Sequence, residues 1–310
     1  MKPTRQLLTL ALIAVFAPRV AGAAATRDSI VVSSAWLTQH LKDPNLVLLH
    51  VGDKAEYDAA HIPGARFVAL QDLHVSDRSG AGLILEMAPA DVLRGKLEAF
   101  GISDDSKVVV YFGKDWVSPS TRLMFTLDWA GLGDRSALLD GGQPAWTRGG
   151  GAVTATPPQV QPGHLSPLKT RPIVASRDDV RARVGKPGYA VLDARNTEFY
   201  DGTRTGGGPD RPHRTGHIAG AASLPFNEVA DDQMMLLSPS DMAARFTKAG
   251  VKPGDTVIAY CHIGQQATAV LFAARSLGFK VELYDGSFED WSRAADSPVD
   301  NPSAPKPVKP

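Results

Sequence analysis

Cysteine is almost absent from this chain, since Cys261 is the only one among 310 residues. A single thiol cannot form an intramolecular disulfide. Net charge is absent as well, because 33 basic residues balance 33 acidic ones. Without an excess of positive charge there is no electrostatic case for binding to nucleic acid or to an anionic membrane surface. The composition therefore favours a small molecule as the partner.

The sequence also lacks a hydrophobic run long enough to cross a bilayer, which takes about twenty residues. Near the N-terminus, two basic residues precede the apolar run Leu7–Ala17, and small-residue cleavage sites end at Ala23 or Ala25. This order is typical of a secretory signal peptide. We therefore expect residues 1–25 to be removed, no stable membrane insertion after cleavage, and a secreted protein, periplasmic in a bacterium.

Cys261 stands where a strand is expected to end and a helix to begin. The apolar stretch Val257–Tyr260 is typical of a strand inside a parallel sheet, and Ala267–Leu277 is a strong helix former. A sulfur in the turn between them faces unpaired N–H groups and the positive end of the helix dipole, which favour a thiolate and a bound anion. Free cysteines are usually small core hydrophobes. The junction instead favours a thiol that is catalytic or that serves another molecule.

The sequence contains an internal repeat. Ile30–Ser33 and the helical stretch after it are echoed by Ile173–Ser176, and Asp140–Trp146 has the same Asp-to-Trp spacing as Asp285–Trp291. Each unit begins with a strand and a serine-capped helix. The chain is therefore expected to hold two copies of one α/β unit. The expected division is a first domain at 28–150, a linker at 151–171, a second domain at 172–296 and a Pro-rich, mobile tail at 297–310.

Two segments of the chain resemble signatures of the rhodanese family, the thiosulfate and 3-mercaptopyruvate sulfurtransferases, in its tandem-domain form. Tyr57 and His61–Ala65 fit the N-terminal signature, and Val281–Trp291 fits the C-terminal one except for Asp290, where glutamate is usual. The resemblance implies an α/β fold of two rhodanese-like domains, each a central parallel sheet flanked by helices. It also implies that only the second domain is catalytic, with Cys261 carrying sulfane sulfur as a persulfide to cyanide or a thiol.

The loop after Cys261 suits this chemistry. The thiolate attacks the outer sulfur of a donor, and the resulting Cys–S–S⁻ has to be stabilised without a metal. Backbone N–H groups that converge on the sulfur supply this stabilisation; Gly264 permits the tight curl, and the small Ala267 lets the helix start close by. Two glutamine side chains add donors or remain solvated. The expected active-site loop consists of His262, Ile263, Gly264, Gln265, Gln266 and Ala267.

The first unit lacks these residues. Phe112 stands at the position of the cysteine. His50 and Gly52 stand where the second unit has Asp193 and Arg195. We therefore expect the first domain to be a structural partner that walls the active-site cleft, as in the family.

Several polar residues of both units have structural as well as functional interpretations. His61 and His217 begin equivalent turns, where a histidine more often fixes the turn by hydrogen bonds than transfers protons. Asp193 and Arg195 are expected to form an ion pair that braces the active-site loop, and through this supporting role Asp193 is a substrate-binding candidate. Asp285 is expected to cap the helix that follows it.

An insertion at residues 201–214 supplies candidate contacts for an anionic donor. The resemblance places this segment near the catalytic loop and implies that it contributes arginines. Arg211 is the nearest match, with Arg204 and Arg214 as alternatives, and a solvated flexible loop is the competing interpretation. Phe199 stands where many relatives have a further arginine, so the expected anion site is incomplete.

The neighbours of the cysteine favour thiosulfate over 3-mercaptopyruvate as the donor. For 3-mercaptopyruvate the resemblance implies a loop serine, where this chain has Ile263, and a first-domain histidine in a segment that here reads Ile84–Pro89. Thiosulfate members usually have two basic residues after the cysteine, and this chain has His262 and Ile263. His262 either supplies a partial positive charge or is an exposed loop residue.

Two alternatives belong to other functional classes. A sulfur carrier or interaction protein shares the cysteine and differs only in lacking turnover with small donors. A cysteine phosphatase or arsenate reductase needs an arginine that grips a tetrahedral oxyanion, whereas the sixth residue after Cys261 is Ala267, which makes this class a poor fit. We expect a monomer without cofactor or metal that uses a small-molecule sulfur donor and a thiol or cyanide acceptor.

Overall fold

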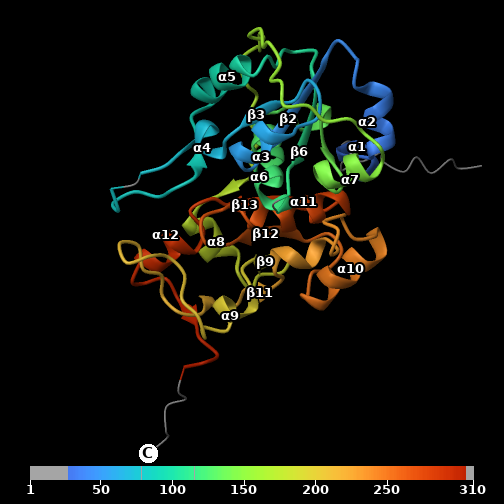
Figure 1. Ribbon diagram of the computed structural model, residues 1–310. Coiled ribbons are helices and arrows are strands. Elements are labelled where there is room, and N and C mark those ends of the chain that lie inside the picture. Colours follow the sequence, from blue (N-terminus) through green and yellow to red (C-terminus); the bar gives the residue numbers. More distant parts are fainter. Residues whose placement is uncertain (1–26, 78, 115, 305–310) are drawn as a thin grey trace, which may run out of the picture.

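The structure, a computed structural model, describes residues 27–77, 79–114 and 116–304, so the expected leader at 1–25 lies outside the described residues. Two five-stranded parallel sheets, one per domain, lie one above the other with helices around them (Figure 1). The strand orders are β1-β7-β6-β2-β3 and β11-β9-β12-β13-β8, which are the same order once the repeated strands are matched. This confirms the predicted α/β fold. No helix among the described residues is long and apolar enough to cross a bilayer.

The first sheet is built around two strands with continuous apolar runs, as expected where helices cover both faces of a parallel sheet. Its strands are β1 (Val31–Val32), β2 (Leu46–Val51), β3 (Arg66–Val68), β6 (Lys107–Phe112) and β7 (Ser136–Leu139). The helices of this domain are α1 (Arg27–Ile30), α2 (Ser34–His40), α3 (Lys54–Ala59), α4 (Leu70–Leu73), α5 (Ala90–Ala99), α6 (Val117–Trp129) and α7 (Gly142–Arg148), with a 3₁₀ turn at Gly133–Arg135. A short hairpin of β4 (His74–Val75) and β5 (Glu86–Met87) extends from it.

The second sheet repeats this plan, and its central strand β12 leads into the cysteine loop. Its strands are β8 (Val174–Ala175), β9 (Tyr189–Asp193), β11 (Ala222–Ser223), β12 (Thr256–Tyr260) and β13 (Lys280–Tyr284). Its helices are α8 (Arg177–Arg183), α9 (Thr197–Tyr200), α10 (Pro239–Lys248), α11 (Ala267–Ser276) and α12 (Ser287–Arg293), with a 3₁₀ turn at Phe226–Val229. Ser33 and Ser176 cap α2 and α8 through their side chains, as the repeat predicts.

The two turn histidines have the predicted structural role in both domains. His61 stacks on Tyr57 with ring centroids 3.9 Å apart, and its Nδ1 lies 2.7 Å from the Tyr57 carbonyl oxygen. His217 repeats this arrangement on Tyr200, at 3.6 Å and 2.8 Å. Since a carbonyl oxygen only accepts, Nδ1 donates in each case and the imidazole fixes the turn.

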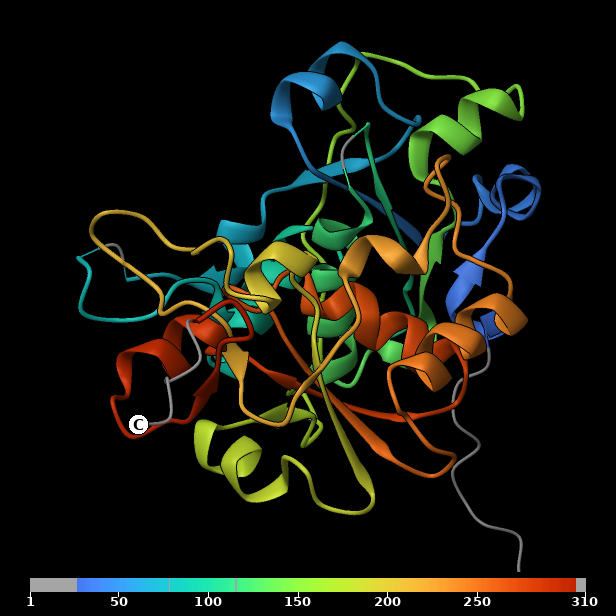
Figure 2. The same ribbon diagram turned by 90° about the horizontal axis from the view of Figure 1, so that it is seen from below.

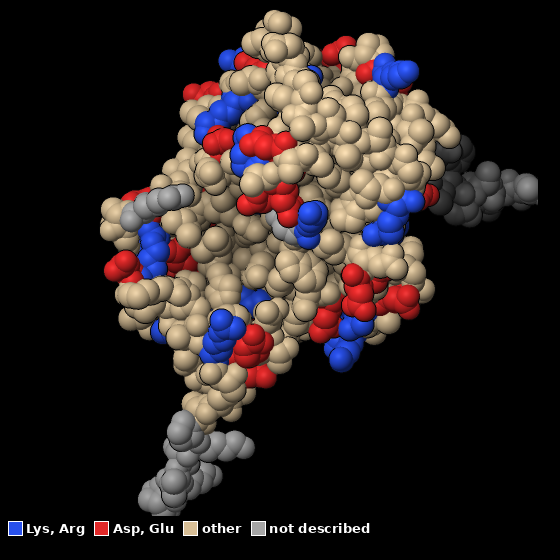
Figure 3. Space-filling view, viewed as in Figure 1, with Lys and Arg blue, Asp and Glu red and all other residues tan. Residues whose placement is uncertain are grey.

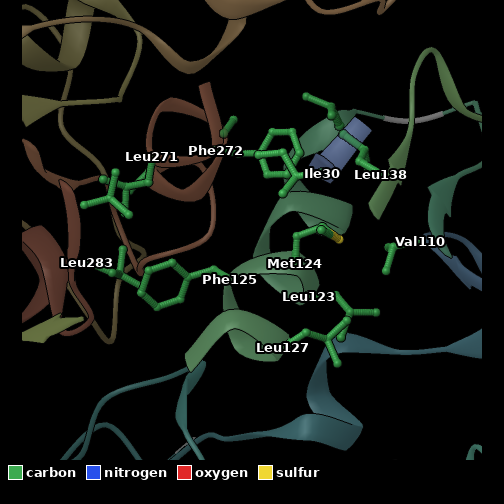
Figure 4. Packing of buried hydrophobic residues seen from close by; sticks show 14 of the residues in the cluster. Ile30, Val110, Leu123, Met124, Phe125, Leu127, Leu138, Leu271, Phe272 and Leu283 are labelled. Carbon is green, nitrogen blue, oxygen red and sulfur yellow. The ribbon is translucent and has the colours of Figure 1, made fainter. Parts of the chain in front are cut away.

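The two domains share one hydrophobic core. Helices α6 and α11 lie between the two sheets, and Phe125 of α6 belongs to the same buried cluster as Leu271 and Phe272 of α11 (Figures 1 and 4). At the same interface the hydroxyl oxygens of Thr121 and Thr268 lie 3.0 Å apart. An apolar interface of this kind holds two domains in a fixed relation.

The segments outside the two sheets are more ordered than expected. The linker at 151–171 packs on the first domain, where Leu165 is buried and its N–H donates to Glu98 Oε1 at 2.9 Å. The mobile-tail prediction is wrong for residues 297–304, because β14 (Val299–Asp300) pairs with β10 (His217–Ile218) in an antiparallel ladder. The backbone of the tail thus finds partners in the second domain, and proline content alone did not reveal them.

Candidate active site

Cys261 lies directly after β12, six positions before α11 begins, and is 1% exposed. Its N–H donates to Ser287 Oγ at 3.2 Å, and its carbonyl oxygen accepts from the N–H of Phe288 at 3.0 Å. Ser287 itself has a left-handed backbone with φ of 52° and donates to the Tyr284 carbonyl oxygen at 2.9 Å. The turn between β13 and α12 therefore fixes the backbone of Cys261 through these hydrogen bonds.

Free amide groups surround the start of the loop. Within the part of the chain that the structure describes, none of the N–H groups of residues 262–266 has a hydrogen-bond acceptor. Gly264 has φ of +80°, and a Cβ there would lie 2.9 Å from the Asp285 carbonyl oxygen and 3.0 Å from Arg122 Nη1. Only glycine fits this curl without strain. Unpaired N–H groups ahead of the buried Ala267 at a helix N-terminus form an anion site.

His262 occupies neither of the environments expected from the sequence. Its ring packs edge-on against Phe199 at 4.6 Å and stacks with His213 at 5.6 Å. Burial and the charge of Arg195 lower the pKa of His262 to about 3, so the imidazole is neutral at physiological pH. The expectation of a partial positive charge at His262 is therefore wrong, and so is that of an exposed loop residue. Gly206 approaches the ring so closely that an added Cβ would lie 2.4 Å from it, which accounts for the partial burial of His262.

A cavity of about 360 Å³ lies beside the loop, between the two domains. The second domain contributes Ile263 and Gln265, whose Nε2 lies 3.4 Å from Ser118 Oγ of the first domain. The remaining loop glutamine, Gln266, has a buried Oε1 without a partner among the described residues. The full lining is Gln71, Ser76, Ile84, Leu85, Arg211, Ile263 and Gln265. Because both domains line the cavity, the first domain walls the site, as expected.

Arg211 borders this cavity but is already engaged. Its guanidinium forms an ion pair with Glu289, and it donates to the carbonyl oxygens of Asp77 and, at 2.8 Å, Gly82. Figure 2 shows the loop that carries it beside the loop between β4 and β5. Of the alternatives, Arg204 is exposed and lies 3.5 Å from Glu198 of α9. The insertion is thus an anchored loop that joins the two domains.

Asp193 does not reach the cavity. It is fully buried, accepts from Arg195 Nε at 2.9 Å, and accepts from the Tyr260 hydroxyl at 2.7 Å. Arg195 in turn lies over the ring of Phe288, 4.0 Å from its centroid. The substrate-binding assignment of Asp193 is therefore corrected, because every contact of its carboxylate is internal. It braces the end of β9 against β12.

The first domain has an inert counterpart of this site. Phe112 is fully buried at the cysteine position, and His50 is fully buried at the position of Asp193. Both His50 ring nitrogens lack hydrogen-bond partners among the described residues, and burial lowers the pKa of His50 to about 4. The phenyl ring of Phe112 has no nucleophilic atom, and the His50 imidazole is shielded from solvent by its burial.

Two residues that contact the first-domain side of the site differ from the sequence analysis: Arg122 was not predicted, and the predicted role of Asp285 is wrong. Asp285 does not cap α12; it accepts from the N–H of Met87 at 2.8 Å and pairs with Arg122 Nη2 at 2.8 Å, across the domain interface. Arg122 also donates to the carbonyl oxygen of Gly264 in the cysteine loop, at 3.1 Å. The available signal was an arginine directly before the apolar run Leu123–Phe125 of α6.

Glu86 should make the stability of the protein depend on pH. Burial and the nearby carboxylates Asp285 and Asp290 raise the pKa of Glu86 to about 7, so the folded protein binds this proton more tightly than the unfolded chain. The resulting stabilisation is complete below about pH 4.5 and is lost as the pH rises through about 7. We expect a loss of about 1–2 kcal/mol in the free energy of unfolding, because solvent screens this partly exposed group. Urea unfolding of wild type and Glu86→Gln at pH 5.5 and 8.5 measures it, and an unchanged pH dependence in the variant would show that another group is responsible.

The surface charge of the molecule is mixed. Basic and acidic side chains alternate over the face shown in Figure 3. Among the described residues there is no group of three or more His, Cys, Asp or Glu that could hold a metal ion. What the geometry provides is a buried thiol, free amides and a cavity shared by two domains. Such a site suits a sulfur nucleophile that carries a negative charge.

Similarity to known proteins agrees with this arrangement. The probable 3-mercaptopyruvate sulfurtransferase of Pseudomonas aeruginosa is 31% identical over 279 residues, which cover 86% of this chain and 96% of that protein. The thiosulfate sulfurtransferase of the same organism is 29% identical, with 87% and 97% covered. The sulfur carrier protein TtuD of Thermus thermophilus is 28% identical, with 87% and 96% covered.

Solved structures share the fold. The crystal structure of YnjE has a TM-score of 0.77 at 22% identity, and the match covers 89% of this chain and 69% of that one. The rhodanese-like domain family matches residues 33–148 and 176–294, one match in each of the two α/β units. The chain therefore belongs to the rhodanese family of sulfurtransferases and carries two rhodanese-like domains in tandem.

Proposed function

We propose that the protein is a thiosulfate sulfurtransferase that works through a persulfide on Cys261. The thiolate attacks the outer sulfur of thiosulfate, the S–S bond of the donor breaks, and sulfite leaves with the electron pair. Cyanide or a thiolate then attacks the outer sulfur of Cys–S–S⁻, which returns the Cys261 thiolate and yields thiocyanate or a new persulfide. No net oxidant or reductant is consumed in either step.

The observation that carries this proposal is the set of amide N–H groups at residues 262–266, which lack acceptors among the described residues. Such groups would stabilise the persulfide anion and the charge that develops on the sulfur during transfer. One chain supplies both walls of the adjoining cavity, which supports the proposal that a monomer is active.

The choice of thiosulfate rests on the polar groups near the loop. Ile263 brings an apolar side chain to the cavity wall where a serine would support 3-mercaptopyruvate. Glu86 lies in the first-domain segment that would supply the histidine, and its carboxyl group is partly buried near Asp285 and Asp290 of the second domain. Arg211 is the basic residue of the cavity lining, and an anionic donor would share its guanidinium with Glu289. The Pseudomonas aeruginosa relatives include one protein named for each donor, so identity alone does not decide between them.

We expect a kcat/KM for thiosulfate at least about tenfold above that for 3-mercaptopyruvate, which corresponds to about 1.4 kcal/mol of transition-state binding. The reason is that both polar groups that would assist 3-mercaptopyruvate are replaced, by Ile263 and Glu86. Steady-state assays with cyanide as the acceptor measure the ratio. A tenfold preference for 3-mercaptopyruvate would overturn the donor assignment.

Arg211→Ala tests whether this arginine binds the donor. Both donors are anions, so loss of the Arg211 charge should raise KM for each of them, and more for the dianion thiosulfate than for the monoanion 3-mercaptopyruvate. If KM stays constant for both donors, Arg211 only joins the two loops, through Glu289 and the carbonyl oxygens that it already contacts.

A sulfur carrier is the second candidate, because a relative of similar identity and coverage bears that name. A carrier would form the same persulfide but would pass it to a partner protein without turnover on small donors. The assays above separate the two, since a carrier gives a single equivalent of transferred sulfur per chain.

We also propose that the protein is exported, which rests on the sequence of residues 1–25 alone. Cleavage would leave a mature chain that begins near Ala24 or Thr26. N-terminal sequencing of the native protein tests this, and recovery of cytosolic protein that retains Met1 would contradict it.

A further inference from the structure

A fully buried arginine of the first domain connects three segments around the cysteine loop. Arg122 of α6 donates through Nη1 to the Gly264 carbonyl oxygen at 3.1 Å. Its Nη2 donates to the Leu85 carbonyl oxygen at 2.6 Å and pairs with Asp285 Oδ1 at 2.8 Å. A guanidinium that is 0% exposed is tolerated only when its charge and its donors are satisfied. Here the partners that satisfy it belong to both domains.

His74 binds Nε, the remaining nitrogen of this guanidinium. The His74 Nδ1 faces the Leu70 carbonyl oxygen at 2.7 Å, so Nδ1 carries the proton. Its Nε2 therefore accepts, and Arg122 Nε donates to it at 3.1 Å. Burial and the charge of Arg122 lower the pKa of His74 to about 3, which keeps the ring neutral. With Nε held in this way, the other two nitrogens of Arg122 face the loop and the cavity wall.

The contact with Gly264 determines which way one peptide of the loop faces. In a trans peptide unit the carbonyl of one residue and the N–H of the next point in opposite directions. Because Arg122 binds the Gly264 carbonyl, the N–H of Gln265 is directed away from Arg122. If this peptide turned over, a carbonyl oxygen would replace a donor in the set of free amides and would repel an anionic sulfur.

The contact with Leu85 holds the opposite wall of the cavity. Leu85 has φ of 61°, a left-handed conformation that is strained for a residue with a side chain. Arg122 binds its carbonyl oxygen, and Ser76 Oγ accepts from its N–H at 2.9 Å. Leu85 and Gln265 both line the cavity, so one guanidinium fixes the first-domain wall and the second-domain wall together.

We propose that Arg122 is a positioning residue for sulfur transfer: it orients the Gly264–Gln265 peptide and closes the cavity, so that the first domain sets the geometry in which the persulfide forms. This inference rests on the proposed role of Cys261. It assigns to the first domain a part in positioning the cysteine loop, beyond that of a wall.

The test compares Arg122→Met with a matched variant of another buried arginine. Arg275 of α11 is 8% exposed and bridges to α6 through Asp128 at 3.3 Å, but it makes no contact with the cysteine loop. Arg275→Met therefore removes a buried interdomain arginine without touching the site. Each variant is mixed with thiosulfate over a range of concentrations, and persulfide formation is followed by intact mass at a temperature where circular dichroism shows it folded.

We expect Arg122→Met to lower the saturated rate of persulfide formation by about a hundredfold, as misplaced reacting groups do. Arg275→Met should stay within about threefold of wild type. Arg122→Lys should lower this rate by about tenfold, because an ammonium group cannot bind several partners at once in the planar geometry of a guanidinium. Equal rates for Arg122→Met and Arg275→Met would overturn the proposal.

If Arg122→Met does not fold, the rate of Arg122→Lys is the test. A rate of persulfide formation by Arg122→Lys within about twofold of wild type would then overturn the proposal. The experiment separates this outcome from a failure of the proposed function. If the proposed function is wrong, the wild-type protein itself forms no persulfide. If only the positioning role is wrong, wild type and Arg122→Met form the persulfide at equal rates.

Discussion

Cys261→Ser is expected to lower sulfur transfer by at least about a thousandfold, with the fold intact. Serine keeps the size of the side chain, but a hydroxyl is a far weaker nucleophile than a thiolate and cannot hold a persulfide. The side chain is 1% exposed and is followed by the free amides of residues 262–266. No other cysteine exists in the chain to replace it. Steady-state thiocyanate production from thiosulfate and cyanide measures the loss.

The control for this variant is its stability. A serine hydroxyl at a buried position costs about 1 kcal/mol or little more when a hydrogen-bond partner is near. The urea midpoint should therefore change little. Retention of more than about 1% of wild-type turnover by a folded Cys261→Ser protein would contradict the role of Cys261 as the nucleophile.

Asp193→Asn is expected to lower the free energy of unfolding by about 3–5 kcal/mol. The substitution removes the negative charge that faces Arg195, and both side chains are almost completely buried. A cation without its partner is costly in such surroundings, and the Tyr260 hydroxyl also loses its charged acceptor. Chemical denaturation followed by circular dichroism measures the change.

A surface ion pair provides the matched control. Lys54 and Asp58 pair on α3 with side chains that are 59% and 55% exposed, so Asp58→Asn should cost less than about 1 kcal/mol. If Asp193→Asn costs as little as Asp58→Asn, the buried pair does not brace the second domain.

The features that were predictable from the sequence are local ones. The repeat gave the two sheets because strand and helix signals, such as the serine caps at Ser33 and Ser176, depend on neighbouring residues. The curl at Gly264 follows in the same way from a glycine between a strand and a helix. The cysteine loop was located from its position between β12 and α11 alone.

The features that the sequence hid depend on contacts between distant segments. Arg122 meets Gly264 across 142 positions of the chain, and no periodicity within α6 indicates this partner. His262 is partly covered by Gly206 and His213, which belong to an insertion with few local signals. Asp285 looks like a helix cap because it precedes α12, yet its carboxylate faces the first domain. In these three cases the side chain has its partner in another segment of the chain.

The first domain thus contributes to the site despite having no nucleophile of its own. Its helix α6 packs against α11 and carries Arg122, while its β4–β5 hairpin supplies Leu85 to the cavity. The first domain lines the cavity beside the cysteine loop, as expected, and Arg122 also contacts the loop itself. The first unit has no cysteine at the position of Phe112, yet it packs closely against the second unit.

Intact-mass analysis of the wild-type protein tests the central claim most directly. Exposure to thiosulfate should add the mass of one sulfur atom per chain, and cyanide should then remove it, because Cys261 is the only thiol available. Cys261→Ser should show neither change. An unaltered mass of the wild-type protein under excess thiosulfate would contradict the proposed persulfide mechanism with this donor.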